Sequence, residues 1–384
     1  MNQPLAATAT GAIDDAAIDG QIAAIVDYLA RSQGADGAFP TYRAFPGPAP
    51  SYVGATAFDG WYSFGECPFC TANIVYHLTG IDLPGVAGII EKGCAALARG
   101  MENGVARYVP AHAKAIDFPT DVDDTCLAAV ALERNGIDSG ANLAMVLENI
   151  TPGGDILTWL VPRPAPLYRR LRHRASRRWL RADKEVADAA MRSYGTPANI
   201  MALIDAEYRD SFEPGVAANV LLYCGVTPRS RPLLKRLIER IETEDMPPGY
   251  YASLIVAYFH VARLAVHDIA QLDRVKKKIL DYCSALQQPD GMIDTPFHTA
   301  LAALSYMYFG AWDRPQLARA VDYVARHPMH REGWLPLHYC NDLHGVFIDG
   351  GAELTAALYM EVLYRWRRRD AGGNSQMNRT NRGE

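Results

Sequence analysis

Two kinds of helix alternate along the sequence, six of each, and this alternation constrains the fold more than any other feature. The first kind is amphipathic and is expected at 13–32, 84–101, 140–150, 229–243, 269–287 and 314–327. The second kind is apolar and almost free of charge, and is expected at 69–79, 121–134, 214–224, 249–263, 296–309 and 353–366. A helix that is apolar all round must be buried, whereas an amphipathic helix covers a core. The sequence therefore predicts an all-α protein, an (α/α)6 toroid of six inner and six outer helices around a central, partly apolar cavity.

No linker-like stretch divides the 384 residues into separate domains. We expect an N-terminal tail at 1–12, a single toroid domain at 13–368 with a basic insertion at 151–213, and a disordered, polar C-terminal tail at 369–384. Connections from an inner helix to the next outer helix are short, whereas those from an outer to an inner helix are long. Because long loops usually carry function, an active site should open at the rim above the N-termini of the inner helices.

A weak internal repeat supports the toroid. Gln33, followed by the sequence DGAF at 36–39, recurs as Gln287 followed by DGMI at 290–293, and a third echo spans 323–334. Each copy follows an outer helix, as expected if one helical hairpin is the repeating unit.

Three acidic residues, Asp121, Asp123 and Asp124, open the second inner helix. Helix capping explains one or two acids at such a position, because they interact favourably with the N-terminal end of the helix dipole. Three carboxylates within four residues repel one another, and they lead directly into an apolar segment. In a low-dielectric environment they cannot all ionise, so at least one should keep its proton near neutral pH. A strong acid that faces an apolar cavity suits the protonation of an alkene.

The segment DVDDT at 121–125 resembles the DxDD(T) motif of class II terpene cyclases, a family that includes squalene–hopene and copalyl diphosphate cyclases. Those enzymes are helical toroids, and their Gln…Gly-aromatic repeats are similar to the repeat described above. The resemblance implies an isomerase that protonates and cyclises a linear isoprenoid, which could be a prenyl diphosphate. It implies Asp123 as the general acid, with Asp121 and Asp124 supporting it.

This chain departs from the family pattern in three respects. The familiar class II cyclases have a second helical domain that closes over the cavity, whereas a single ring is expected here. Phe39 and Ile293 stand where the glutamine–tryptophan repeats carry tryptophan. The DDxxD metal motif of class I cyclases is missing from the sequence, so ionisation of an allylic diphosphate is not the expected chemistry.

A carbocation needs aromatic faces and protection from water. The aromatic residues expected to bind the substrate at the rim are Trp61, Tyr62, Phe69, Trp159, Tyr250, Tyr251, Phe297 and Trp334. Taken singly, each of them could simply pack a long loop onto the ring. The basic run at 169–181 includes Arg169 and Arg170, which could hold a substrate diphosphate together with Mg²⁺. The same run is compatible with peripheral contact to anionic lipid, or with a solvated helical insertion.

A competing interpretation is a zinc-dependent toroid enzyme. Cys67 and Cys70 have the CxxC spacing of zinc sites and precede the first inner helix, while His338 and Cys340 precede the sixth. Ring closure would make these two loops neighbours. Lanthionine cyclases bind zinc at the mouth of a similar toroid, and the segment FHT at 297–299 is similar to the histidine segment of protein prenyltransferases. Two further alternatives are a toroid that binds a lipid or peptide without catalysis, and a sugar-active toroid with a second carboxylate across the cavity.

Composition limits the partners. The net charge of −5 gives no general attraction to nucleic acid, and no apolar run is long enough to span a bilayer. The N-terminal sequence lacks the basic start and apolar core of a signal peptide, and most of the seven cysteines lie in apolar helical contexts, as reduced thiols do. We therefore expect a cytoplasmic protein with a small-molecule isoprenoid substrate, and the sequence leaves its oligomeric state open.

Overall fold

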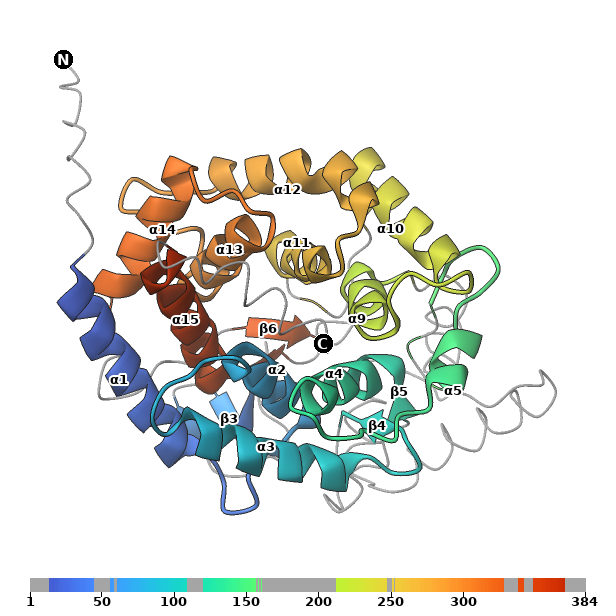
Figure 1. The fold of residues 1–384 in the computed structure, drawn as a ribbon, viewed down its shortest axis with the longest axis horizontal. Coiled ribbons are helices and arrows are strands. Elements are labelled where there is room, and N and C mark those ends of the chain that lie inside the picture. Colours follow the sequence, from blue (N-terminus) through green and yellow to red (C-terminus); the bar gives the residue numbers. More distant parts are fainter. Residues whose placement is uncertain are drawn as a thin grey trace.

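The computed structural model describes residues 14–44, 56–58, 61–108, 120–156, 158, 160, 212–246, 251, 253–327, 338–341 and 348–369. Within these residues, six apolar helices form an inner ring (Figure 1). They are α2 (Pro68–Leu78), α4 (Val122–Glu133), α9 (Pro214–Cys224), α11 (Leu254–Arg263), α13 (Pro296–Tyr308) and α15 (Ala352–Arg367). Each inner helix packs on the next one along the chain, and α15 packs on α2, which closes the ring. The predicted inner ring is confirmed.

In the part of the chain that the structure describes, six further helices lie outside this ring (Figure 1). They are α1 (Asp15–Ser32), α3 (Val86–Gly100), α5 (Leu143–Glu148), α10 (Arg231–Thr243), α12 (Asp273–Ala285) and α14 (Pro315–Arg326). In α1, for example, Ile18, Ile22, Ile25 and Leu29 recur at helical spacing and are buried, and α1 packs against α15. A helix with one apolar stripe can bury it only on the inward side, so the amphipathic set covers the apolar set. The fold is therefore the all-α toroid that the alternation predicts.

Three predicted helices are markedly shorter than expected or are interrupted. The outer helix expected at 140–150 is limited to α5, because Asn142 is its N-cap and accepts a hydrogen bond from the Met145 N–H. The fourth inner helix was expected from 249 but begins at Leu254, because Ser253 has an extended backbone and its hydroxyl accepts a hydrogen bond from the Val256 N–H as an N-cap. Tyr251 consequently lies before the helix and not within it. The outer helix expected at 269–287 is divided into a 3-10 turn, η2 (Ala270–Leu272), and α12, and a second 3-10 turn, η1 (Leu264–His267), follows α11 directly.

The long connections contain a small antiparallel sheet that the all-helical pattern did not predict. Its strand order is β2 (Thr56–Phe58), β3 (Trp61–Glu66), β1 (Pro40–Ala44), β7 (Ile348–Gly350), β6 (His338–Asn341). Strand β1 belongs to the first long connection and β7 to the last, and they pair with Arg43 opposite Asp349. The Arg43 guanidinium also donates two hydrogen bonds to the Asp349 carboxylate, at 2.7 and 2.8 Å. The prediction that ring closure makes these two connections neighbours is confirmed.

The glutamine repeat corresponds to one turn structure used twice. The Gln33 side-chain amide donates to the carbonyl of Gly37 in its own turn and to that of Ile89 in α3, both at 2.9 Å. Gln287 donates in the same way to Gly291, at 3.2 Å, and to Gln316 of α14, at 2.8 Å. Each glutamine therefore ties its turn to the next outer helix. The third echo extends beyond the described residues.

Replacing Gly37 with alanine is expected to lower the free energy of unfolding by about 2–4 kcal/mol. Gly37 has a φ of +91°, and a Cβ atom there would lie 2.2 Å from the backbone oxygen of Lys92, which cannot move independently of α3. Gly80→Ala is the matched control, because Gly80 has a φ of +85° but nothing within 4 Å of the added atom. It should lose only the backbone contribution, about 1–2 kcal/mol. Denaturant unfolding of both variants measures the difference, and equal losses would contradict the steric argument.

Candidate functional site

The acid cluster lies at the start of inner helix α4. Strand β5 (Thr120–Asp121) pairs with β4 (Ala106–Arg107) and keeps the chain extended up to Asp121, which is the N-cap of the helix. The Asp121 carboxylate accepts a hydrogen bond from the Asp124 N–H at 2.7 Å, and its carbonyl accepts one from the Thr125 hydroxyl at 2.6 Å. Capping therefore accounts for Asp121, whereas Asp123 and Asp124 need another explanation.

Asp121 and Asp124 form a buried pair. Their side chains belong to residues that are only 4% and 2% exposed, respectively. Burial, and then the neighbouring charge of Asp121, raise the pKa of Asp124 well above its usual range. Burial also raises the pKa of Asp121, to about 7, although the hydrogen bond from Asp124 lowers it. Burial and mutual repulsion therefore favour the protonated form of Asp124 beside Asp121.

Asp123 differs from its two neighbours because it is partly exposed. Both of its carboxylate oxygens have a donor: the Asn219 side-chain amide donates to Oδ1 and the Tyr251 hydroxyl donates to Oδ2, each at 2.7 Å. Desolvation by the surrounding protein raises the pKa of Asp123, while these two hydrogen bonds and the charge of Arg263 lower it. The arrangement combines surroundings that raise the pKa of the acid with donors that stabilise the anion left after proton transfer.

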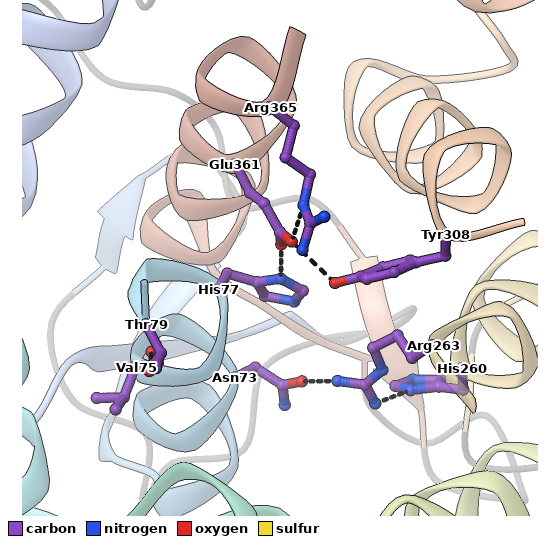
Figure 2. A network of polar contacts seen from close by, with 9 residues as sticks. All are labelled: Asn73, Val75, His77, Thr79, His260, Arg263, Tyr308, Glu361 and Arg365. Atoms are coloured by element: carbon purple, nitrogen blue, oxygen red, sulfur yellow. Dashed lines mark hydrogen bonds and ion pairs between the residues drawn. The ribbon is translucent and has the colours of Figure 1, made fainter. Parts of the chain in front are cut away.

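A line of polar side chains continues from Asn219 into the centre of the ring. The Asn219 side-chain oxygen accepts a hydrogen bond from Arg263, the last residue of α11. The Arg263 guanidinium also contacts His260 Nδ1 and lies 3.4 Å from the side-chain oxygen of Asn73 in α2, as Figure 2 shows. Burial, followed by the charge of Arg263, lowers the pKa of His260 well below its usual range, so that its ring is neutral and accepts the contact.

A further carboxyl group that interacts with the cluster, Glu213, is buried and was not predicted. It is the N-cap of α9, where it accepts a hydrogen bond from the Val216 N–H at 2.6 Å. Burial raises its pKa to about 8, and the charge of Asp123 contributes in the same direction. The only sequence signal was its position before Pro214, which marks a helix start but gives no hint of burial.

Stability is expected to fall as the pH rises from about 5 to 8. Because the folded-state pKa of Glu213 is raised from 4.5 to about 8, the folded state binds its proton more tightly than the unfolded state over that range. Unfolding free energy therefore decreases by up to about 1.4 kcal/mol per pH unit for such a group, and Asp121 adds to the slope below pH 7. Glu213→Gln should flatten this dependence, whereas Glu239→Gln, at an exposed position of α10, should not. Thermal unfolding across this pH range measures the dependence of stability on pH. An unchanged slope in the Glu213 variant would refute the raised pKa of Glu213 as its cause.

The structure brings two of the expected substrate-binding aromatic residues to the acid cluster. The ring centroids of Phe69 and Tyr251 are 6.0 Å apart, and Tyr251 contacts Asp123 directly. Phe297 is buried in the first turn of α13, where its ring lies 5.7 Å from that of His298. The side chains of Trp61, Tyr62, Trp159, Tyr250 and Trp334, and residues Arg169 and Arg170, lie outside what the structure describes.

Cys67 and Cys70 lie at the start of α2 and are buried. Burial, more than any neighbouring charge, raises the pKa of both thiols well above the usual range, so they are protonated at neutral pH. Among the side chains that the structure describes, no three His, Cys, Asp or Glu residues gather closely enough to hold a metal ion. The side chains of His338 and Cys340 are not among them, so the zinc interpretation stays untested.

A second polar cluster lies within the ring, apart from the acids. Glu361 of α15 accepts hydrogen bonds from Arg365 Nε at 2.6 Å, from the Tyr308 hydroxyl at 2.9 Å and from His77 Nδ1 at 2.6 Å (Figure 2). Despite burial, the charge of Arg365 and the bond from His77 lower the pKa of Glu361 to about 2. This cluster links three inner helices through one carboxylate, while His77 Nε2 has no hydrogen-bond partner among the described residues.

No protein-family model and no curated protein sequence matches the chain. Solved structures do match it. A protein from Actinoplanes superposes with a TM-score of 0.62 at 15% identity, over 92% of this chain and 99% of that one. A variant of the type II terpene cyclase MstE from Scytonema, in complex with geranylgeranyl dihydroxybenzoate, gives 0.63 at 14% identity, over 92% and 98%. Another MstE variant, in complex with the product merosterolic acid A, gives 0.63 at 14% identity, over 91% and 97%.

These likenesses establish the fold alone: the chain is a helical toroid with the same overall arrangement as these structures. The two MstE variants, whose structures are described as those of a type II terpene cyclase, are covered over 98% and 97% of their length. A second domain is therefore not a requirement of the fold. Within the described residues, no helix is both long enough and apolar enough to cross a membrane.

Proposed function

We propose that the protein is a class II terpene cyclase, an isomerase that cyclises a linear isoprenoid after protonation by Asp123. The observation that carries the proposal is the asymmetry of the acid cluster. Asp121 and Asp124 are buried and bonded to each other, whereas Asp123 is partly exposed and held by Asn219 and Tyr251. Only Asp123 has both an accessible acid group and a prepared site for its conjugate base.

The proposed reaction conserves mass. The O–H bond of protonated Asp123 breaks as a C–H bond forms at the terminal alkene carbon, and the alkene electron pair becomes that bond. The resulting tertiary cation is attacked by the next alkene along the chain, which closes a ring and moves the charge onward. Loss of a proton to a base then forms a new alkene, so substrate and product are isomers. Aromatic faces such as those of Phe69 and Tyr251 stabilise the cations during this sequence.

The substrate class follows from the chemistry and from the structural neighbours. MstE is bound to geranylgeranyl dihydroxybenzoate in one structure, an isoprenoid chain joined to an aromatic head group. We propose a linear isoprenoid for this chain as well. If its head group is a diphosphate, Arg169 and Arg170 are the residues proposed to bind it. Mg²⁺ is proposed to accompany such a diphosphate.

Product analysis tests the proposal. Purified protein is incubated with farnesyl diphosphate, geranylgeranyl diphosphate, geranylgeranyl dihydroxybenzoate and squalene, and the products are separated and analysed by mass spectrometry. We expect at least one substrate to give a cyclised product of unchanged mass, which disappears in the Asp123→Asn variant. A product that persists in that variant would exclude Asp123 as the acid. Absence of any product, together with stoichiometric zinc in the purified protein, would favour the zinc alternative.

A further inference from the structure

Arg263 is a buried cation that has no role in the reaction steps proposed above. It is fully buried, with 0% exposure, and its guanidinium lies over the rings of Tyr76 and Phe259, at 5.0 and 5.1 Å from their centroids. Its nearest hydrogen-bonding partners are the neutral side chains of Asn219, Asn73 and His260. Its Nε has no partner in the described part of the chain.

A buried guanidinium without a bonded carboxylate is expensive to keep in a folded protein. The other buried arginines that the structure describes solve this differently: Arg365 is bonded to Glu361 and Arg43 to Asp349. For Arg263, no described carboxylate lies within ion-pair distance. The acidic group connected to it is Asp123, reached through a single side chain, Asn219. The positive charge is therefore best compensated when Asp123 is ionised.

The orientation of the Asn219 amide makes this connection directional. A guanidinium only donates hydrogen bonds, so the amide oxygen must face Arg263 and the NH₂ group must face Asp123. That NH₂ group lies 2.7 Å from both Asp123 Oδ1 and the Tyr251 hydroxyl. Arg263 thus fixes the amide so that it can only donate to Asp123, and its charge polarises the donating N–H.

We infer that Arg263 is a positioning residue that strengthens Asp123 as an acid, acting through Asn219 to stabilise the carboxylate left after proton transfer. The consequence for turnover rests on the proposed function, whereas the coupling between Arg263 and Asp123 exists in the free protein. Arg263 is connected to Asp123 through the Asn219 side chain. It sets how readily the acid gives up its proton.

Several other ionisable groups face Asp123 and must be kept constant in any test. Asp121 and Asp124 are on its own helix, and Glu213 lies at the start of α9. From α2, Cys67 interacts with the adjacent Asp124. From the α11 side come Tyr251 and Arg263, with the neutral His260 beside Arg263. All of these except Arg263 remain unchanged in an Arg263 variant.

The test is a direct titration of Asp123 in the free protein. Carboxyl signals of ¹³C-aspartate-labelled protein are followed with pH, and that of Asp123 is identified by its loss in Asp123→Asn. We expect Arg263→Gln to make Asp123 about tenfold weaker as an acid, and Asn219→Ala to do the same. The double variant should show no further shift, because both changes interrupt one connection. Arg263→Lys, which keeps the charge, should restore part of the acidity.

Arg134→Gln is the matched control. Arg134 also lies over the Tyr76 ring, at 4.2 Å, so its replacement removes a cation from the same region without touching Asn219. It should leave the titration of Asp123 unchanged. A folded Arg263→Gln protein with an unaltered Asp123 titration would overturn the inference. If that variant does not fold, an unaltered titration in Asn219→Ala would overturn it equally.

A kinetic measurement separates this inference from the proposed function. An epoxide oxygen is more basic than an alkene, so a weaker acid slows alkene protonation more than epoxide protonation. With squalene and its terminal epoxide as probes, the ratio of epoxide to alkene turnover should rise in Arg263→Gln. If neither probe nor any substrate tested above is turned over, the proposed function is contradicted, but the titration result remains valid. A constant ratio with a shifted titration would contradict the role in catalysis alone.

Discussion

Turnover by the Asp123→Asn variant is expected to fall by about a thousandfold or more, with the fold unchanged. Asparagine has nearly the same shape as aspartic acid, and its amide can still contact Asn219 and Tyr251. It cannot release a proton to an alkene, however, because an amide is far too weak an acid. The adjacent carboxyl groups cannot replace Asp123, since Asp121 and Asp124 are buried and bonded to each other. Product formation under single-turnover conditions, with thermal unfolding as a check on the fold, measures the effect.

Asp124→Asn is the control that makes this result specific. Asp124 is buried, and burial raises its pKa well above the usual range, so asparagine keeps its shape and matches the protonated form that burial favours. We expect its turnover to remain within about tenfold of the wild type, a smaller effect than removing a general acid. The reverse order, with Asp124→Asn inactive and Asp123→Asn active, would move the proton donor to Asp124 and refute the assignment.

Helical periodicity predicts the ring almost completely, because the distribution of apolar residues within each helix indicates which of its faces is buried. The apolar sequence of α9 (Pro214–Cys224) predicts that the helix is buried. The amphipathic sequence of α14 predicts that one side of that helix faces solvent. The small sheet is different. Strand β1 pairs with β7, and the Arg43–Asp349 pair that accompanies it joins residues 306 positions apart. That pairing forms between segments that only ring closure brings together, so no local sequence pattern predicts it.

The candidate site likewise contains one part that the local sequence predicts and one part that it does not. The acid cluster stands out because three carboxyl groups in four residues are locally unusual, and the position of the cluster at an inner-helix N-terminus follows from the helix prediction. Asn219 and Arg263, which set the chemistry of Asp123, are separated from it by long stretches of chain. Their signal in the sequence is faint: Asn219 is one polar residue within an apolar helix, and Arg263 ends an apolar helix that also carries His260. Recognising that both face the same carboxylate requires the register between α4, α9 and α11, which only the packed ring defines.

Glu361→Gln is expected to lower the free energy of unfolding by about 3–5 kcal/mol, the largest stability effect anticipated for a single polar substitution in the ring. The carboxylate of Glu361 is the counter-ion of the buried Arg365 and the acceptor for His77 and Tyr308. Glutamine keeps the volume but removes the negative charge, and its NH₂ group would face donors on at least one side. The guanidinium is then left buried without compensation. Denaturant unfolding measures the loss.

The pH dependence of this variant distinguishes a lost charge from a merely disturbed packing. Because the folded-state pKa of Glu361 is lowered from 4.5 to about 2, its ionised form stabilises the wild type fully above about pH 4.5. That contribution is lost as the pH falls through about 2. The gap between wild type and Glu361→Gln should therefore narrow on acidification, whereas a packing defect would keep it constant. Asp322→Asn, at an exposed ion pair with Arg326 on α14, should cost less than about 1 kcal/mol at any pH. This contrast follows from burial: water solvates Arg326 once its partner is gone, but it cannot reach Arg365 inside the ring.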